Sequence, residues 1–352
     1  MKNIKNENYY SILMKMRAMV LREYKKIENK PLLLEELPIP IPKDREILIE
    51  ISACGICRTE LDEAEGRLST KLPVIPGHQI IGRIRKLGSS TKKYGIGERV
   101  GVAWIYSACG ICSYCKNGLE NLCSNFIGTG CSADGGYAEY IVVNEDFVYP
   151  IPERFSDFEA APLLCAGAIG YRALKLCKMK DGDVIALYGF GSSAHIVFQL
   201  IRFLFPNSKI FVFTKRRGDR ASELALSMGA DWVGETGESP PIKFNCAIDT
   251  TPVGVSILEA LRNLDRGGRL IINLIRKETS INGLDYVTHL WGEREIKTVA
   301  NVTRNDVSEF LEIASRIPIK PEIVKFRLEE ANDALLMLKY GKYTGSGILV
   351  IR

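Results

Sequence analysis

The sequence predicts an α/β protein in which a β-rich domain is followed by a doubly wound parallel sheet. With 352 residues, the chain exceeds the roughly 250 residues at which a single core stops growing, so two domains are expected. Short strand-like runs broken by Gly and Pro fill the first part of the chain, whereas strand-like and helix-like runs alternate in the second. Repeated strand–helix–strand units are typical of a parallel sheet covered by helices.

The domain boundaries are predicted from this change of pattern. Residues 1–15 are expected to form a flexible extension, because their short apolar patch fits neither a membrane span nor a cleavable signal. Residues 16–154 are predicted to form the β-rich domain, with a loop-like lobe at 107–125. Residues 155–299 are predicted to form the parallel-sheet domain. Residues 300–352 are expected to return to the first domain through a closing strand.

The individual elements follow from hydrophobic periodicity and turn residues. The strands expected in the first domain are Arg17–Tyr24, Glu46–Ile51, Gln79–Leu87, Arg99–Trp104 and Tyr137–Val143. The second domain is expected to contain strands at Asp183–Tyr188, Ile210–Thr214, Asn245–Thr250 and Arg269–Asn273, and helices at Phe158–Lys175, Ala194–Phe205, Arg220–Met228 and Ser256–Leu264. The remaining elements are helices at Asp306–Arg316 and Leu328–Lys339 and a strand at Gly347–Ile351.

Composition is that of an ordinary soluble protein. Hydrophobic residues make up 46%, charged residues 25%, and the net charge is +5 without a concentrated basic block. This argues against a nucleic-acid or membrane partner. Ten cysteines without a secretion signal indicate a reducing cytoplasm, where thiols serve as metal ligands or core residues.

Four cysteines form a C-x2-C-x2-C-x7-C run: Cys109, Cys112, Cys115 and Cys123. Four closely spaced thiolates match tetrahedral zinc, whereas free core cysteines or disulfides suit such crowding poorly. Four sulfur ligands also leave no coordination position for a substrate, so the run predicts a structural zinc site. Lys116 is the one basic residue between 107 and 125, which is too little charge for a phosphate-binding face.

A glycine-rich turn follows the strand at Asp183–Tyr188 and opens a helix. Its residues are Gly189, Phe190, Gly191, Ser192, Ser193 and Ala194. The pattern G-x-G-x-x-A at a strand-to-helix junction is typical of a dinucleotide site, where the helix N-terminus faces the pyrophosphate. A plain glycine turn is the alternative for the motif taken alone.

The end of the next strand bears on the choice of nucleotide. A carboxylate there would bond the ribose 2′-OH of NAD, but this chain has Thr214 followed by Lys215, Arg216 and Arg217. A hydroxyl and cations suit a 2′-phosphate, so NADP(H) is favoured over NAD(H). The alternative is a solvated basic turn.

Three more candidate metal ligands lie in separate segments: Cys57, His78 and Cys165. Each alone could be a buried structural residue. Their order and flanking residues, together with the four-cysteine run and the dinucleotide turn, resemble the zinc-dependent medium-chain alcohol dehydrogenase family over Arg17–Arg352. The runs Asp134–Tyr140, Leu163–Tyr171 and Tyr188–His195 are most similar to its cinnamyl-alcohol-dehydrogenase-like branch.

The resemblance implies a GroES-like fold for the first domain and a Rossmann fold for the second. It also implies two zinc ions per chain, the catalytic one held by Cys57, His78 and Cys165 with a fourth position open to substrate. Thr59 matches the hydroxyl that begins the family's proton relay. Asp62 stands where several relatives have a relay histidine and is either a relay group or a surface acid.

Other positions are expected to surround this metal. Glu60 would support the ligands, and Gln79 replaces a glutamate found in many relatives. Trp104, Leu290 and Trp291 are candidates for the wall of the substrate cleft.

The expected activity is interconversion of primary or secondary alcohols with aldehydes or ketones by hydride transfer. The expected partners are a small alcohol or aldehyde substrate and further copies of the chain, since relatives are dimers or tetramers. An NADPH-dependent carbonyl or enone reductase is one alternative. A non-catalytic nucleotide-binding sensor on the same fold is another.

Overall fold

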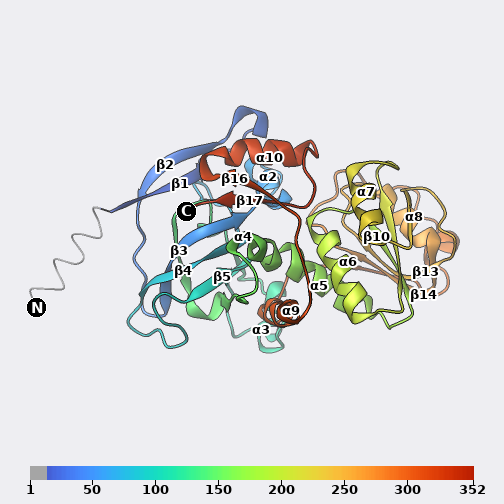
Figure 1. Ribbon diagram of the computed structural model, residues 1–352, viewed down its shortest axis with the longest axis horizontal. Coiled ribbons are helices and arrows are strands. Elements are labelled where there is room, and N and C mark those ends of the chain that lie inside the picture. The colour runs from blue at the N-terminus through green and yellow to red at the C-terminus, as the bar shows by residue number, and fades with distance from the viewer. Residues whose placement is uncertain (1–13) are drawn as a thin grey trace, which may run out of the picture. The chain divides into compact units, whose positions relative to one another are not determined.

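The computed structural model (Figure 1) describes residues 14–352. The extension expected at 1–15 lies almost wholly outside the described residues, although Lys15 already begins the first strand, β1 (Lys15–Leu21). The chain divides into two compact units. The first comprises the chain through Cys165 together with Thr303–Leu311 and Glu322–Arg352, and the second comprises Ala166–Val302 and Glu312–Pro321.

These units differ from the predicted domain boundaries. The first unit extends to Cys165 rather than 154 because Asp157, which begins α4 (Asp157–Ala160), is bound into the β-rich sheet. Arg99 Nε lies 2.7 Å from Asp157 Oδ1, and Ser52 Oγ donates to Asp157 Oδ2 over 2.5 Å. The C-terminal segment is shared between the units, since 312–321 group with the second.

The first unit is built on a seven-stranded sheet in the order β16-β17-β3-β4-β5-β9, with β8 also paired to β3. The strands are β3 (Glu46–Gly55), β4 (Ile80–Leu87), β5 (Arg99–Val102), β8 (Tyr140–Asn144), β9 (Val148–Pro150), β16 (Ile323–Arg327) and β17 (Ser346–Val350). The closing strand β17 runs antiparallel to β3, with Leu349 opposite Cys54. Two small ribbons pair β1 with β2 (Leu32–Pro38) and β6 (Ile105–Ser107) with β7 (Ile127–Gly128). Helices α2 (Arg58–Ala64) and α10 (Ala331–Lys339) pack against each other.

The second unit contains a six-stranded parallel sheet in the order β12-β11-β10-β13-β14-β15. The strands are β10 (Val184–Tyr188), β11 (Lys209–Thr214), β12 (Trp232–Glu235), β13 (Phe244–Asp249), β14 (Leu264–Ile272) and β15 (Glu295–Thr298). The helices are α5 (Ala166–Cys177), α6 (Ser192–Leu204), α7 (Arg220–Ser227), α8 (Val255–Asn263) and the end of α9 (Arg304–Arg316). Strand order reverses between β10 and β13, and ligands of such sheets bind at the carboxyl ends of the strands at this point.

Packing in the second unit follows the alternation of side chains along its strands. Alternate residues of β10, namely Val184, Ala186 and Tyr188, join a core with Ile257 and Leu261 of α8. The intervening residues are also buried and point to the opposite face, because successive side chains of a strand alternate. Burial on both faces accounts for the continuous apolar runs from which these strands were predicted.

Two sequence expectations need correction. The helix expected at Phe158–Lys175 is interrupted by the 3-10 turn η4 (Ala161–Leu164), and Cys165 is non-helical with φ −128° and ψ −71°. By length and composition the helical run Asp157–Cys177 could cross a membrane, but 67% of its apolar window is buried in the protein, as in a core helix. Strand β15 was not predicted, because all four of its residues are exposed and it lacks an apolar pattern.

Candidate active site

The three dispersed ligand candidates meet in the first unit. Cys57 caps the start of α2, His78 lies just before β4, and Cys165 follows η4. Their donor atoms all lie within 4.8 Å of one another, and His78 Nε2 is 3.2 Å from Cys165 Sγ. The break in the helix at Cys165 therefore has a local consequence: it turns this thiol toward the other two groups.

Glu60 organises these groups from α2. Its Oε2 accepts a hydrogen bond from the Cys57 amide over 2.8 Å, and its Oε1 lies 2.6 Å from His78 Nδ1. This contact orients the imidazole so that Nε2 faces the two thiols, an arrangement typical of metal-binding histidines.

The electrostatics of the cluster favour a ligating cysteine at position 57. A hydrogen bond from Cys165 holds the pKa of Cys57 well below its usual range despite burial, with a further contribution from His78. Burial opposes the charged form of His78, yet the Glu60 carboxylate raises the pKa of that imidazole well above its usual value. Among the residues that the structure describes, two sulfur donors and one nitrogen donor form this cluster, a set that fits a zinc site with an open position.

Other sequence-predicted residues take distinct places around the cluster. Thr59 Oγ1 lies 3.5 Å from Cys57 Sγ, so its hydroxyl is beside a candidate ligand. Asp62 is buried, and its Oδ1 accepts from Arg67 Nε over 2.5 Å, so this carboxylate is held in an ion pair. Gln79 is buried, and its side chain packs against Gly55, where a Cβ would come within 2.8 Å of it.

Three aromatic or acidic residues complete the surroundings. Trp104 is 8% exposed and meets the His78 ring edge-on at a centroid distance of 4.8 Å. Tyr343 and Glu63 were missed from the sequence. Burial raises the pKa of Tyr343, as does negative charge on Cys57 and Glu60, and burial raises the pKa of Glu63 well above its usual value. Only Glu63 had a sequence signal, its spacing of three residues from Glu60 on α2, whereas Tyr343 arrives from the distant C-terminal segment.

The four cysteines of the lobe also converge. All four sulfurs lie within 4.8 Å of one another, with Cys109 Sγ 3.8 Å from Cys115 Sγ and 3.5 Å from Cys123 Sγ. Tetrahedral zinc with bonds of about 2.3 Å requires sulfur separations of about 3.8 Å. Backbone amides, including that of Cys112 at 3.4 Å, point at Cys109 Sγ and lower its pKa to about 6. The lobe thus has the spacing and the amide donors of a thiolate metal site.

The predicted dinucleotide turn lies at the carboxyl end of β10. Gly189 has φ +84°, and a Cβ there would come within 2.8 Å of Thr250 Oγ1. Both the backbone conformation and the lack of space therefore require glycine. Gly191 caps α6 and borders open space, which leaves room for a ligand against the backbone. Ala194 is buried, and the Ser193 hydroxyl donates to Ala166 O over 2.8 Å. Ser192 is the first residue of α6 and therefore lies at the helix N-terminus beside the turn.

The basic turn after β11 is less cationic than the sequence suggested. Thr214 is buried, and its hydroxyl donates to Arg216 O over 3.1 Å. Arg217 forms an ion pair with Glu238 at 2.5 Å, and Lys215, Arg216 and Arg217 are all exposed. The charge of one of the three cations is therefore partly offset by an acid.

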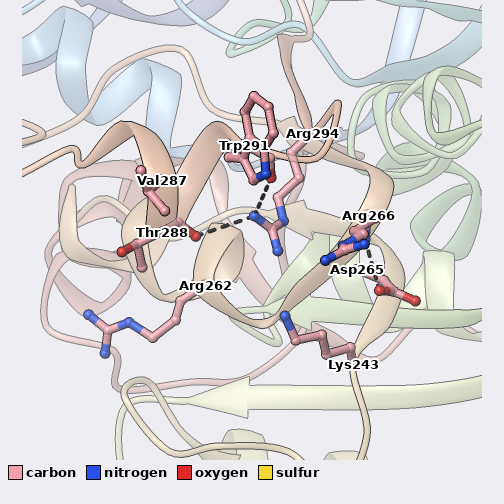
Figure 2. Close-up of a pocket in the computed structure, with 8 residues that line it drawn as sticks. All are labelled: Lys243, Arg262, Asp265, Arg266, Val287, Thr288, Trp291 and Arg294. Atoms are coloured by element: carbon pink, nitrogen blue, oxygen red, sulfur yellow. Dashed lines mark hydrogen bonds between the residues drawn. The ribbon is translucent and has the colours of Figure 1, made fainter.

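Trp291, a candidate for the wall of the substrate cleft, lines a pocket of the second unit. This pocket has a volume of about 430 Å³ and is also lined by Lys243, Arg262, Arg266 and Arg294, whose side chains are drawn in Figure 2. Lys243 immediately precedes β13 and Trp291 comes shortly before β15, so the pocket lies at the amino edge of the parallel sheet. The Gly189 turn lies at the opposite, carboxyl edge.

Comparison with known proteins gives consistent matches. Residues 43–153 match the alcohol dehydrogenase GroES-like domain. A probable alcohol dehydrogenase of Mycobacterium tuberculosis is 40% identical over 96% of this chain and 97% of its own length, and an alcohol dehydrogenase of Geobacillus stearothermophilus is 33% identical over 96% and 99%. The structure of CAD from Helicobacter pylori complexed with NADP(H) superposes with a TM-score of 0.86 at 24% identity, covering 96% of this chain and 98% of that one. The chain belongs to the zinc-type medium-chain alcohol dehydrogenase family.

Proposed function

We propose that this protein interconverts primary or secondary alcohols with aldehydes or ketones by hydride transfer to or from NADP(H), with NAD(H) as the weaker cofactor. The observation that carries the proposal is the cluster of Cys57, His78 and Cys165, whose three donor atoms lie within 4.8 Å of one another. A zinc ion held by these three would have a fourth position open to the substrate. Its named relatives are alcohol dehydrogenases.

Each part of the cluster has a role in this reaction. Cys57, His78 and Cys165 would hold zinc, which when bound supplies a Lewis acid that lowers the pKa of an alcohol or polarises a carbonyl. Glu60 fixes the imidazole orientation through Nδ1. The Thr59 hydroxyl would accept the proton that the alcohol loses while it passes its own proton on to the next group of the relay. Trp104 provides an apolar wall beside His78 that excludes water and favours aliphatic or aromatic substrates over polyols.

The relay beyond Thr59 is proposed to use the cofactor ribose or water. Asp62 is held by Arg67 and is poorly placed to exchange protons. Gln79 offers no carboxylate that could approach the metal, so ligand exchange would proceed without that assistance.

The finer assignments are part of the same proposal. A second zinc would occupy the four-cysteine lobe, where it would stabilise the loop without contacting substrate. The preference for NADP(H) rests on the exposed Lys215 and Arg216 and on the absence of a carboxylate at Thr214. Ten free thiols fit the reducing cytoplasm, and a homo-oligomer, dimer or tetramer, is proposed from the family.

A substrate panel tests the proposed function directly. The purified protein would be assayed with aliphatic and aromatic alcohols in the presence of NADP and NAD, and with the matching aldehydes and ketones in the presence of NADPH and NADH. Turnover of alcohols and their carbonyls with the higher kcat/KM for NADP(H) is expected. Reduction of carbonyls or enones with no measurable alcohol oxidation would favour the reductase alternative, and binding of nucleotide without turnover would favour the sensor.

A further inference from the structure

A lysine with a largely but not fully buried side chain lies at the carboxyl edge of the parallel sheet, close to the dinucleotide turn. Lys277 follows β14 in the chain, and its side chain is 15% exposed. Its Nζ donates to Asp249 Oδ2 over 2.6 Å, to Thr251 O over 2.6 Å and to Val253 O over 3.2 Å. An ammonium group that has lost much of its contact with water needs several hydrogen-bond partners to offset that loss.

Asp249 is the fully buried last residue of β13, and both of its carboxylate oxygens are bonded. Oδ1 accepts from the Thr251 amide and the Thr251 hydroxyl, each over 2.8 Å. Oδ2 accepts from Ser256 Oγ over 2.7 Å in addition to Lys277. Through these bonds the ion pair holds the whole loop between β13 and α8, from Asp249 to Ser256 in the first turn of the helix.

This loop in turn contacts the residues that form the dinucleotide turn. The Thr250 amide and hydroxyl both donate to Tyr188 O, over 2.9 and 3.0 Å, and Tyr188 immediately precedes Gly189. Gly189 is packed so closely against Thr250 that a methyl group would not fit. The contacts run without interruption from Lys277 through Thr251 and Thr250 to the turn.

The residues that follow Lys277 in the chain also hold this loop by hydrogen bonds. The Glu278 amide donates to Pro252 O over 2.7 Å, and the Gly254 amide donates to Thr279 Oγ1 over 2.7 Å. Lys277 is thus the charged centre of a contact between the segments that follow β13 and β14. These strands and β10 are neighbours in the sheet, at the point where strand order reverses.

We propose that Lys277 is a positioning residue for the dinucleotide. By neutralising Asp249 and binding the Thr251 and Val253 carbonyls, it holds the Thr250–Val253 loop against the Gly189 turn in the conformation that accepts the cofactor. The inference rests on the proposed function, because it assumes that the turn binds NADP(H).

The test measures cofactor affinity and stability separately. NADPH binding would be followed by fluorescence titration, and unfolding by denaturant titration, in the wild type and the Lys277→Met, Lys243→Met and Asp249→Asn/Lys277→Met variants. Lys243 is an exposed lysine at the opposite edge of the same sheet and serves as the matched control.

The Lys277→Met substitution removes charge-assisted hydrogen bonds and is expected to raise the Kd for NADPH about tenfold or more. It should also lower stability, because Asp249 is left buried without its cation. The double variant removes that unpaired charge, so stability should largely recover. Its affinity should stay low, because the Thr251 and Val253 carbonyls still lack their donor. Lys243→Met should bind NADPH as the wild type does.

Two results would overturn the inference. One is wild-type affinity in the Lys277→Met variant. The other is recovery of affinity together with stability in the double variant, which would make Lys277 a purely structural residue. If Lys277→Met fails to fold, the double variant alone decides between these outcomes. Failure of the wild type to bind NADPH or NADH would instead refute the proposed function.

Discussion

Replacing Glu60 with glutamine probes how the candidate metal site is organised. Glu60 is 1% exposed and uses one oxygen toward His78 Nδ1 at 2.6 Å and the other to accept from the Cys57 amide at 2.8 Å. A glutamine of the same shape has only one acceptor oxygen, so one of the two contacts must be lost. Glu60→Gln thus leaves the side-chain volume nearly unchanged, but either His78 or Cys57 loses the contact that orients it.

The magnitude follows from the bonds that are removed. One charge-assisted hydrogen bond contributes about 1.5–3 kcal/mol, and each 1.4 kcal/mol corresponds to about a tenfold change in affinity. Zinc affinity at the open site and kcat/KM for alcohol oxidation should therefore both fall about 10–100-fold, the usual range for groups that support metal ligands. Zinc affinity would be measured by competition with a chromophoric chelator, and kcat/KM by steady-state kinetics.

Glu63→Gln is the matched control on the same helix. Glu63 is as buried as Glu60, burial raises its pKa well above the usual value, and a glutamine at this position is nearly isosteric. Zinc affinity and turnover should remain close to those of the wild type. Our reasoning is refuted if Glu60→Gln leaves both quantities unchanged, or if Glu63→Gln reduces them equally.

Three further outcomes are expected. Replacing Lys215 and Arg216 with serine should lower the ratio of kcat/KM for NADP over NAD about tenfold or more, since each cation can bond a 2′-phosphate; an unchanged ratio would remove the basis for NADP preference. Cys112→Ser should lose about one zinc per chain, because only the four-cysteine lobe is affected, and its Tm should fall, because a structural zinc contributes to folding stability. The pKa of Glu145, a buried carboxylate, is lowered despite burial because two backbone amides and Arg45 donate to it. Its contribution to stability should be complete above about pH 4.3 and lost as pH falls through its lower folded value; denaturant unfolding of Glu145→Gln should show a shallower acid dependence than the wild type.

Features encoded by neighbouring residues could be predicted from the sequence. The glycine turn, the parallel strands around it and the four-cysteine run each follow from spacing within one segment. The convergence of Cys57, His78 and Cys165 required a family resemblance, because no local pattern relates residues so far apart in the chain.

Other features depend on contacts that spacing does not specify. The ion pair of Lys277 with Asp249 joins the ends of two strands, and Tyr343 reaches the first unit through the returning C-terminal segment. The pairing of Arg217 with Glu238, which partly offsets the charge of the basic turn, depends on which acids the next loop presents. Trp291 could not be placed, because the exposed strand after it carries no apolar pattern.

Metal analysis of the Cys57→Ser variant tests the central claim most directly. The wild type should contain about two zinc ions per chain and the variant about one, because the four-cysteine lobe is untouched. The variant should keep its circular dichroism spectrum and NADPH affinity but lose alcohol oxidation. A Cys57→Ser protein that retains full activity and about two zinc ions would contradict the assignment of the catalytic metal to Cys57, His78 and Cys165.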